Sequence, residues 1–404
     1  MSSTEEDIIH RLKENARKEL TENILPFWTE RMPDRKQGGF YGRIDGKNTV
    51  HPDAPKGAVL NARILWTFSS ACYDLGIPSS LEAASRAWEY INRFFFDEEY
   101  GGVWWSLNSN GTPRETKKQV YAQAFFIYAL SRYFITTGDN NAGKRAVELY
   151  ELLEKHSLDR QYGGYLEAFS REWKEMEDIR LSKKDENEKK TTNTNLHVLE
   201  AYTMLSKVWP DRHLRSQLRS LLRSFLEKII HSGTFHLQLF FDEFWNPRSQ
   251  LVSYGHDIEA AWLLYEAALM LGDPSLIRGV AEISVKMVDA ALEGFQDDGS
   301  LIYEKDDSKG YLDMDRHWWV QAEAVVGLVH AWQLTGKKGY LEKADRCFSY
   351  ITGHLTDRKN GEWYWSIRAD GTANTVDDKA GFWKCPYHNS RMCMEIMRRF
   401  KEIS

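Results

Sequence analysis

The 404-residue sequence lacks several features that mark specialised classes of protein. It has only four cysteines, Cys72, Cys347, Cys385 and Cys393, and no Cys-x-x-Cys unit. Zinc-ribbon and thioredoxin-like chemistry are therefore disfavoured, and we expect reduced thiols. No stretch approaches the roughly 18 consecutive apolar residues of a membrane-spanning helix, so we expect no membrane partner.

The sequence also lacks an excess of positive charge. Its formal net charge is -6 at pH 7. Proteins that bind nucleic acids need a basic face, so we exclude nucleic acid as a partner. The first 20 residues are polar and contain no apolar segment of the kind found in secretory signals, which predicts a cytoplasmic location.

Aromatic residues, in contrast, are abundant. They make up 13% of the chain, including 15 tryptophans. Aromatic rings pack into cores, and they also stack on the apolar faces of sugar rings. The composition is therefore compatible with a protein that binds carbohydrate.

A signal made of glycine followed by aromatic residues recurs about every 62 residues. It is strongest at Gly38–Tyr41, Gly101–Trp105 and Gly163–Tyr165, and weaker forms follow at Ser232–Phe235, Asp298–Tyr303 and Asn360–Tyr364. Each signal begins a short alternating run that ends in a polar turn, as in a small β-hairpin. The chain therefore contains six similar units.

Between these signals the apolar residues follow a helical period. The segment Val120–Leu130 is apolar on nearly all sides, whereas Ala142–Leu153 has one apolar stripe and a charged face. Each unit thus pairs a buried helix with an outer one. Six such units predict an all-α fold, an (α/α)6 barrel of helix hairpins with short β-hairpins in the loops, as one catalytic domain over residues 1–404.

One charged run interrupts this pattern. Residues Lys183–Lys190 contain no apolar anchor, so we expect a solvated loop. The run directly precedes the polar start of a predicted inner helix, and a lid over a site is the alternative interpretation.

Polar residues cluster at the starts of the predicted inner helices, which would converge on one mouth of the barrel. They include three histidines, an arginine and two glutamates: His197, His256, His388, Arg63, Glu259 and Glu323. A single histidine at a helix start is more often a cap or a core group than a catalyst. Their recurrence at equivalent positions instead favours a shared site, because lone buried charges are strongly destabilising.

A metal site is one alternative for these residues. His256 and Glu259 are spaced i,i+3 and could bind an ion together with His197 or His388. We recognise no second histidine–carboxylate pair in the sequence, and we therefore predict a site with neither metal nor other cofactor.

Four blocks of sequence together resemble the cellobiose 2-epimerases, within the N-acylglucosamine 2-epimerase superfamily. These blocks are Asn61–Trp66, Ser253–Ala260, Trp318–Ala324 and Trp383–Arg391, and the likeness runs from Arg17 to Phe400. One departure is Ser390, which stands where the family pattern has glycine. The resemblance implies reversible conversion of the reducing-end glucose of a β-1,4-linked disaccharide, such as cellobiose or lactose, to mannose.

The resemblance also implies roles for ten residues. The catalytic set comprises His388 and His256 as general base and acid at C2, His197 and Arg63 as groups that hold the reacting oxygens, and Glu259 in ring opening. The substrate-binding set comprises Tyr121, Asn193 and Glu304 for sugar hydroxyls, and Trp319 and Trp383 for stacking. Such chemistry needs two groups that titrate near neutrality, because the C2 proton leaves one face of the sugar and returns to the other.

Other functions stay open at this point. They are a 2-epimerase acting on mannose and glucose or on N-acylglucosamine, an aldose–ketose isomerase, a glycoside hydrolase using Glu259 and Glu323, and a carbohydrate-binding protein. The expected partner is a disaccharide substrate, and we expect a monomer or a weak homodimer.

Overall fold

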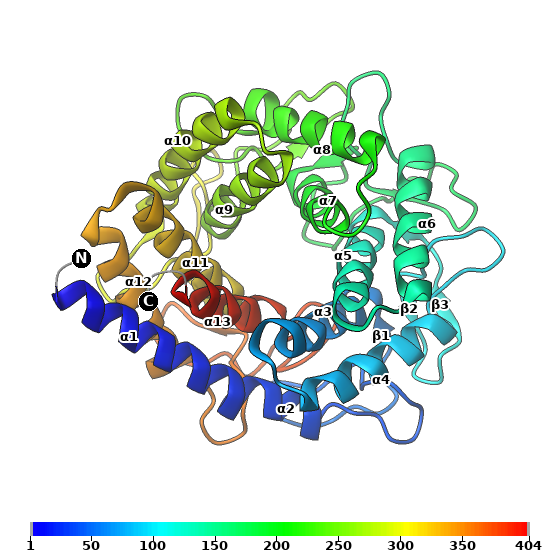
Figure 1. Cartoon of the computed structure of the whole chain (residues 1–404), viewed down its shortest axis with the longest axis horizontal. Coiled ribbons are helices and arrows are strands. Elements are labelled where there is room, and N and C mark those ends of the chain that lie inside the picture. The colour runs from blue at the N-terminus through cyan, green and yellow to red at the C-terminus, as the bar shows by residue number, and fades with distance from the viewer. Residues whose placement is uncertain (1–2, 402–404) are drawn as a thin grey trace.

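The computed structural model describes residues 3–401 and consists of two concentric rings of helices (Figure 1). The inner ring contains α3 (Ala58–Leu75), α5 (Val120–Thr137), α7 (Thr192–Leu205), α9 (Tyr254–Leu271), α11 (Trp318–Thr335) and α13 (Tyr387–Arg399). Each inner helix contacts the next, and α13 contacts α3. The inner ring is therefore closed, and the predicted (α/α)6 barrel is confirmed.

The outer ring contains α1 (Ser3–Lys18), α4 (Ser79–Phe94), α6 (Asn140–His156), α8 (Arg212–Ser224), α10 (Pro274–Ala291) and α12 (Lys338–Tyr350). Shorter helical segments continue some of these helices, namely η1 (Glu19–Ile24), α2 (Leu25–Glu30), η2 (Phe225–Ile229), η3 (Leu292–Gly294) and η4 (Ile351–Leu355). The first helix, α1, packs against α12 and α13. The beginning and the end of the described chain thus lie together (Figure 1).

Local sequence explains where these helices begin and end. Four inner helices stop at a glycine with positive φ: Gly76, Gly138, Gly272 and Gly336. Glycine adopts this left-handed conformation without steric cost, which ends the helix. Three outer helices begin at an aspartate whose carboxylate accepts backbone N–H groups: Asp139, Asp211 and Asp273. No helix among residues 3–401 is long and apolar enough to cross a membrane.

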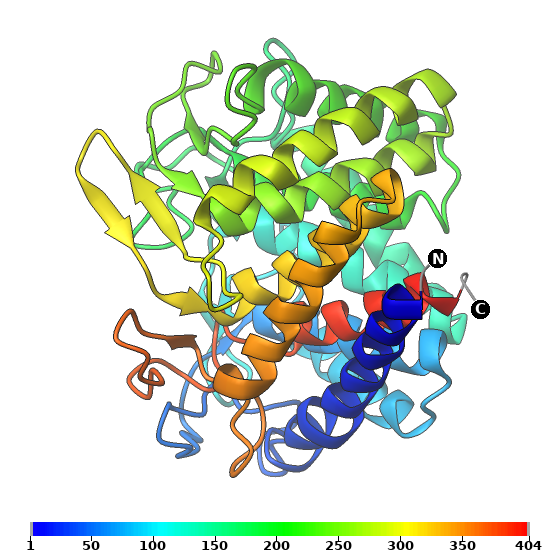
Figure 2. The same cartoon turned by 90° about the vertical axis from the view of Figure 1, so that its left-hand side faces the viewer.

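Short antiparallel strands gather at one end of the barrel, to the left in Figure 2. The strand before an inner helix pairs with a strand from the following unit: β1 (Lys56–Gly57) with β2 (Ser106–Leu107), β4 (Lys118–Gln119) with β5 (Ala168–Phe169), β6 (Lys190–Thr191) with β7 (Phe240–Phe241), β8 (Val252–Ser253) with β9 (Glu304–Asp306), and β11 (Arg316–His317) with β12 (Ser366–Ile367).

The expected hairpins form only in part. Paired strands occur in β2 with β3 (Pro113–Glu115) and in β9 with β10 (Tyr311–Asp313). The more regular pairing joins successive units, and it could not be predicted because its partners lie far apart in the sequence. It ties each inner helix start to the next unit.

Buried ion pairs reinforce the glycine turns. Asp34 accepts the backbone N–H groups of Lys36 and Gln37, and its other oxygen lies 2.9 Å from Nζ of Lys56, which also donates to the carbonyl of Gly38. The arrangement recurs as Lys118–Asp97 at 2.9 Å, Lys190–Asp159 at 2.7 Å and Lys379–Asp357 at 2.5 Å. Lys190 was expected in the solvated loop, but it is buried, because it belongs to β6 and binds Asp159.

These pairs can be tested at Lys56, whose side chain is fully buried. The substitution Lys56→Met should lower the free energy of unfolding by about 3–5 kcal/mol, because it leaves the Asp34 carboxylate buried without its cation. Adding Asp34→Asn should recover part of this loss. Urea-induced unfolding measures both effects, with Lys47→Met at an exposed position as the control. A loss in Lys56→Met no larger than in the control would contradict the assignment.

Candidate active site

One buried arginine, Arg391 of α13, connects four inner helices at the centre of the barrel. Its Nη1 lies 2.6 Å from Oε1 of Glu200 in α7. Its Nη2 lies 2.5 Å from Oε1 of Glu259 in α9 and 2.7 Å from Oε1 of Glu323 in α11. All four side chains are nearly or fully buried. The guanidinium thus compensates carboxylates that could not otherwise stay charged in this interior.

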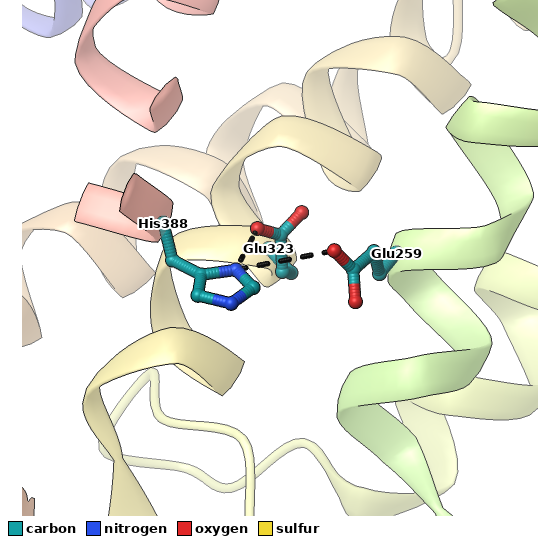
Figure 3. A group of neighbouring side chains, drawn as sticks. All are labelled: Glu259, Glu323 and His388. Carbon is teal, nitrogen blue, oxygen red and sulfur yellow. Dashed lines mark hydrogen bonds and ion pairs between the residues drawn. The ribbon is translucent and has the colours of Figure 1, made fainter. Parts of the chain in front are cut away.

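Three histidines around this centre are each bound through Nδ1. Nδ1 of His388 lies 2.7 Å from Oε1 of Glu323 (Figure 3), and Nδ1 of His197 lies 2.8 Å from Oε2 of Glu200. Nδ1 of His256 lies 2.8 Å from Oγ of Ser253. Within residues 3–401, Nε2 of these three rings forms no hydrogen bond. Each imidazole is therefore oriented through one nitrogen and keeps the other available for proton exchange.

The partners of Glu323 indicate which atom carries the proton. Arg391 donates to Oε1, and the indole N–H of Trp262 donates to Oε2 at 3.1 Å. Because both oxygens already accept from groups that only donate, Glu323 acts as a carboxylate, and His388 donates its Nδ1–H to it. Nε2 of His388 then has the free lone pair of a base.

Figure 3 shows that the Glu259 carboxylate also faces His388. Its Oε1 lies 3.9 Å from Nδ1 of His388, beyond hydrogen-bond distance, and is bound by Arg391. Oε2 of Glu259 makes no hydrogen bond to any described residue. This oxygen is therefore free to accept from a ligand.

Three side chains of this centre are close enough to one another to be considered as metal ligands. Ligand atoms of Glu259, Glu323 and His388 lie within 4.8 Å of one another. The sequence interpretation was wrong on one point, because His197 and Glu200 are a second histidine–carboxylate pair spaced i,i+3. The cationic group that these carboxylates bind is nevertheless Arg391, whose Nη2 contacts both Glu259 and Glu323.

Arg63 of α3 provides a second buried cation of a different kind. Its Nη2 donates to the hydroxyl of Tyr121 at 2.8 Å, and its guanidinium packs on the rings of Phe125 and Tyr387 at 4.2 and 4.7 Å. Among the described residues it forms no ion pair, and its Nε has no hydrogen-bond partner. Tyr121 in turn lies edge-on to His197, with ring centroids 5.0 Å apart. Arg63 can therefore bind a negative charge that arises beside these rings.

Aromatic side chains form two walls beside the histidines. The ring centroid of Trp319 lies 4.8 Å from that of His256 and 5.7 Å from that of His388. Trp383 lies 6.1 Å from Tyr121 and 5.8 Å from Trp105. Trp105 was not expected from the sequence, and nothing in its local pattern distinguishes it from a core residue.

Asn193 and Glu304 contact none of the other expected site residues directly. Asn193 lies in the first turn of α7, and its buried Oδ1 has no hydrogen-bond partner among residues 3–401. Glu304 pairs in β9 with Ser253, the residue that binds His256. Burial raises the pKa of Glu304 to about 7. Glu304 is thus linked to His256 through the pairing of β8 and β9, and Asn193 to His197 through the first turns of α7.

Several polar residues at the helix starts serve the scaffold instead of the site. The side-chain oxygens of Gln123, Asn195, Asp257 and Gln321 accept backbone N–H groups of the glycine turns, at Val103, Tyr165, Leu237 and Leu301 respectively. Arg391, Glu200 and Ser253 were missed as functional residues. Spacing offered a signal, since His197 and Glu200, like His388 and Arg391, are three residues apart on one helix face.

Burial sets the protonation of the catalytic candidates. It lowers the pKa of His256 to about 4 and lowers that of His388 well below the usual 6.5. Burial alone would raise the pKa of Glu200, but the charge of Arg391 and hydrogen bonds from His197 and Tyr387 bring it to about 2. Near neutral pH, His256 and His388 are therefore uncharged in the free protein.

This protonation is measurable by ¹⁵N NMR of the imidazoles. His256 and His388 should remain neutral from pH 8 to pH 5, whereas free imidazole in the same tube titrates in this range. In the unfolded chain both rings bind protons near pH 6.5, so the free energy of unfolding should fall as the pH is lowered from 6.5 towards 4. A midpoint above pH 6 for His256 would contradict the prediction.

Sequence comparisons relate the chain to a family of known proteins. Residues 39–391 match the family model of N-acylglucosamine 2-epimerase (GlcNAc 2-epimerase). The chain is 53% identical over 386 residues to a cellobiose 2-epimerase of Bacteroides fragilis, covering 96% of this chain and 98% of the relative. It is 40% identical over 388 residues to a cellobiose 2-epimerase of Ruminococcus albus, covering 96% and 98%.

A solved structure extends the likeness to three dimensions. The cellobiose 2-epimerase from Bacillus thermoamylovorans B4167 superposes with a TM-score of 0.93 at 38% identity, covering 96% of this chain and all of the other. The family model spans most of the chain, and these relatives match nearly all of it. The chain therefore belongs to the N-acylglucosamine 2-epimerase family.

Proposed function

We propose that this protein is a cellobiose 2-epimerase, which inverts C2 of the reducing-end glucose of cellobiose. The observation that carries the proposal is a pair of histidines whose ring centroids lie 4.8 and 5.7 Å from that of Trp319 and which are bound through Nδ1 alone within residues 3–401. The buried Arg63, which has no carboxylate partner among the same residues, lies in the same centre. The relatives that are 53% and 40% identical to the chain, each over 96% of its length, are cellobiose 2-epimerases. The reaction is an isomerisation with no net oxidation.

The closed sugar ring must open first, because only the aldehyde makes the C2 proton acidic. The anomeric hydroxyl gives its proton to the site, the bond between C1 and the ring oxygen breaks, and the same proton is returned to the ring oxygen. Glu259 supports this step through Oε2, the oxygen that Arg391 leaves free. Arg391 holds the Glu259 carboxylate in place, and Oε2 of this carboxylate accepts a hydrogen bond from the sugar.

Inversion follows as two proton transfers on opposite faces of C2. Nε2 of His388 removes the C2 proton, and the electron pair of the broken C–H bond forms the C1=C2 double bond while the carbonyl electrons move to O1. His256, which is uncharged in the free protein, takes a proton from solvent at Nε2 once the sugar is bound. It then gives this proton to the opposite face of C2, and the C1=O1 bond reforms. At the end His388 is protonated and His256 is neutral. The reverse reaction starts from this state, with the roles of the two histidines exchanged.

The intermediate carries negative charge on O1 and O2, which needs donors already in position. Arg63 supplies a guanidinium that is paired with no carboxylate of residues 3–401 and that donates a hydrogen bond to Tyr121. His197 adds a ring fixed by Glu200. A charged donor in a buried site stabilises such an intermediate by several kcal/mol in comparable oxyanion sites.

The two histidines differ in what binds Nδ1. His388 donates to the Glu323 carboxylate, which favours its protonated form, whereas His256 contacts a neutral hydroxyl. A carboxylate partner stabilises the imidazolium that forms when the base takes the C2 proton, whereas a hydroxyl only orients the ring. This difference supports His388 as the base for glucose and His256 as the acid.

A glycoside hydrolase needs two carboxylates on either side of the scissile bond. Glu259 and Glu323 instead meet at one guanidinium nitrogen of Arg391, and both are 1% exposed. This arrangement does not favour the hydrolase. Lactose shares the reducing-end glucose of cellobiose, so we include it as a substrate. The single domain, the cytoplasmic location and the oligomeric state, a monomer or a weak homodimer, stay predictions.

The reaction itself is tested by incubating the EDTA-treated protein with cellobiose in D2O and recording NMR spectra. The reducing-end glucose should become mannose with deuterium at C2. His388→Ala and His256→Ala should each slow this conversion by about 10²- to 10⁴-fold, as expected for a lost acid or base. His231→Ala, at an exposed position, is the matched control. Release of free glucose, or recovery of unchanged cellobiose, would refute the proposal.

The different Nδ1 partners of His388 and His256 predict different losses of activity when each partner is replaced. Glu323→Gln should lower kcat by about 10- to 100-fold with little change in KM, because His388 loses its anionic partner. Ser253→Ala should lower kcat by less than about 10-fold, because a hydroxyl adds no charge to the imidazolium. Steady-state kinetics distinguishes the two, with circular dichroism to verify folding. Equal losses in kcat, or an effect confined to KM, would exclude this division.

A further inference from the structure

We propose that Asp313, Asp315 and His317 form a second site, which binds a first-row divalent metal ion such as Zn²⁺ at the rim of the barrel. The three residues lie where the β9–β10 hairpin, yellow in Figure 2, returns to the barrel and leads through β11 into α11. None of them belongs to the catalytic machinery proposed above.

The geometry suits a metal ion. One ligand atom from each residue, two carboxylate oxygens and an imidazole nitrogen, lies within 4.8 Å of the other two. Ligands of a tetrahedral Zn²⁺ ion, at bond lengths near 2.0–2.2 Å, are about 3.3 Å apart. Side-chain movements of about 1–1.5 Å would therefore close the three groups around an ion and leave its fourth position to water.

The imidazole of His317 provides independent support. His317 is only 8% exposed, yet neither ring nitrogen forms a hydrogen bond to any residue within 3–401. Its ring stacks on Tyr303 with centroids 3.9 Å apart, which fixes its plane and leaves the nitrogens at the ring edge. A largely buried imidazole that no protein group binds can coordinate an ion through its ring nitrogen, with its orientation already fixed by the stacking.

The carboxylates are also uncompensated. Asp313 and Asp315 form no ion pair within the described chain, whereas the neighbouring Asp298 and Asp306 are paired with Arg316 and Lys309. Two adjacent negative charges repel each other unless a cation lies between them. Asp315 is already oriented, since its oxygens accept from the backbone N–H of Ala369 and the hydroxyl of Ser366.

The donor set selects the class of ion. Mg²⁺ and Ca²⁺ prefer oxygen ligands alone, whereas one imidazole with two carboxylates suits Zn²⁺ or Co²⁺. The other group with metal-ligand geometry, Glu259, Glu323 and His388, binds Arg391 instead. At the rim cluster, no arginine or lysine of residues 3–401 forms an ion pair with Asp313 or Asp315.

Isothermal titration of the EDTA-treated protein with Zn²⁺ tests the proposal. We expect one equivalent to bind, and Asp315→Asn, Asp313→Asn and His317→Gln each to weaken binding at least 10-fold. His354→Gln, at an exposed position elsewhere, is the control for surface histidines. At a free Zn²⁺ concentration 100 times Kd, Tm should rise by about 3 °C in the native chain and not in the variants.

A titration with Co²⁺ adds a spectroscopic measure, because d–d absorption reports the coordination of the bound ion. Unchanged affinity in the aspartate variants would overturn the proposal, whatever the result for His317→Gln, whose stacking on Tyr303 also changes. Binding abolished by His388→Gln alone would place the ion in the catalytic cluster and refute the rim site. Neither measurement depends on the epimerisation of cellobiose.

Discussion

The charge balance around Arg391 is the constraint on which the centre of this barrel depends. One guanidinium binds three glutamates that come from three other inner helices. Buried carboxylates tolerate this environment only while the cation and its hydrogen bonds are in place. The same contacts that keep four helices in register also hold Glu200 and Glu323 in position to orient His197 and His388. Packing and catalysis therefore share a single set of atoms.

The scaffold around this centre repeats one kind of contact, in which a buried polar side chain near the start of an inner helix binds a glycine turn. Lysines that precede inner helices are buried against aspartates of the glycine turns, and amides one turn into the helices bind the turn backbone. These contacts fix the ends of the helices from which the catalytic side chains project. The polar groups at a helix start thus divide between holding the helix and facing the substrate.

Features determined by local sequence could be predicted. The six turns, the buried and amphipathic helices and the closed barrel follow from glycine positions and helical periodicity, and the structure has them. Pairing between units could not be predicted, since Lys56 and Leu107 meet only once the barrel has formed. Lys190 was placed in a loop because the run of charge hides its buried partner. Among the site residues, the histidines stood out by type, whereas Arg391, Glu200 and Ser253 gain their importance only from contacts across the barrel.

The packing of α1 against α13 joins the first outer helix to the last inner helix, so this contact forms late in synthesis. His388 and Arg391 lie on the last inner helix, and the outer helix that covers it is the first element of the chain. During synthesis, five inner helices can associate before α13 exists, and their buried glutamates must wait for its guanidinium. The catalytic centre therefore cannot be completed until α13 has been made, and a chain interrupted before α13 would leave an open ring with exposed apolar faces, a natural substrate for chaperones and proteases.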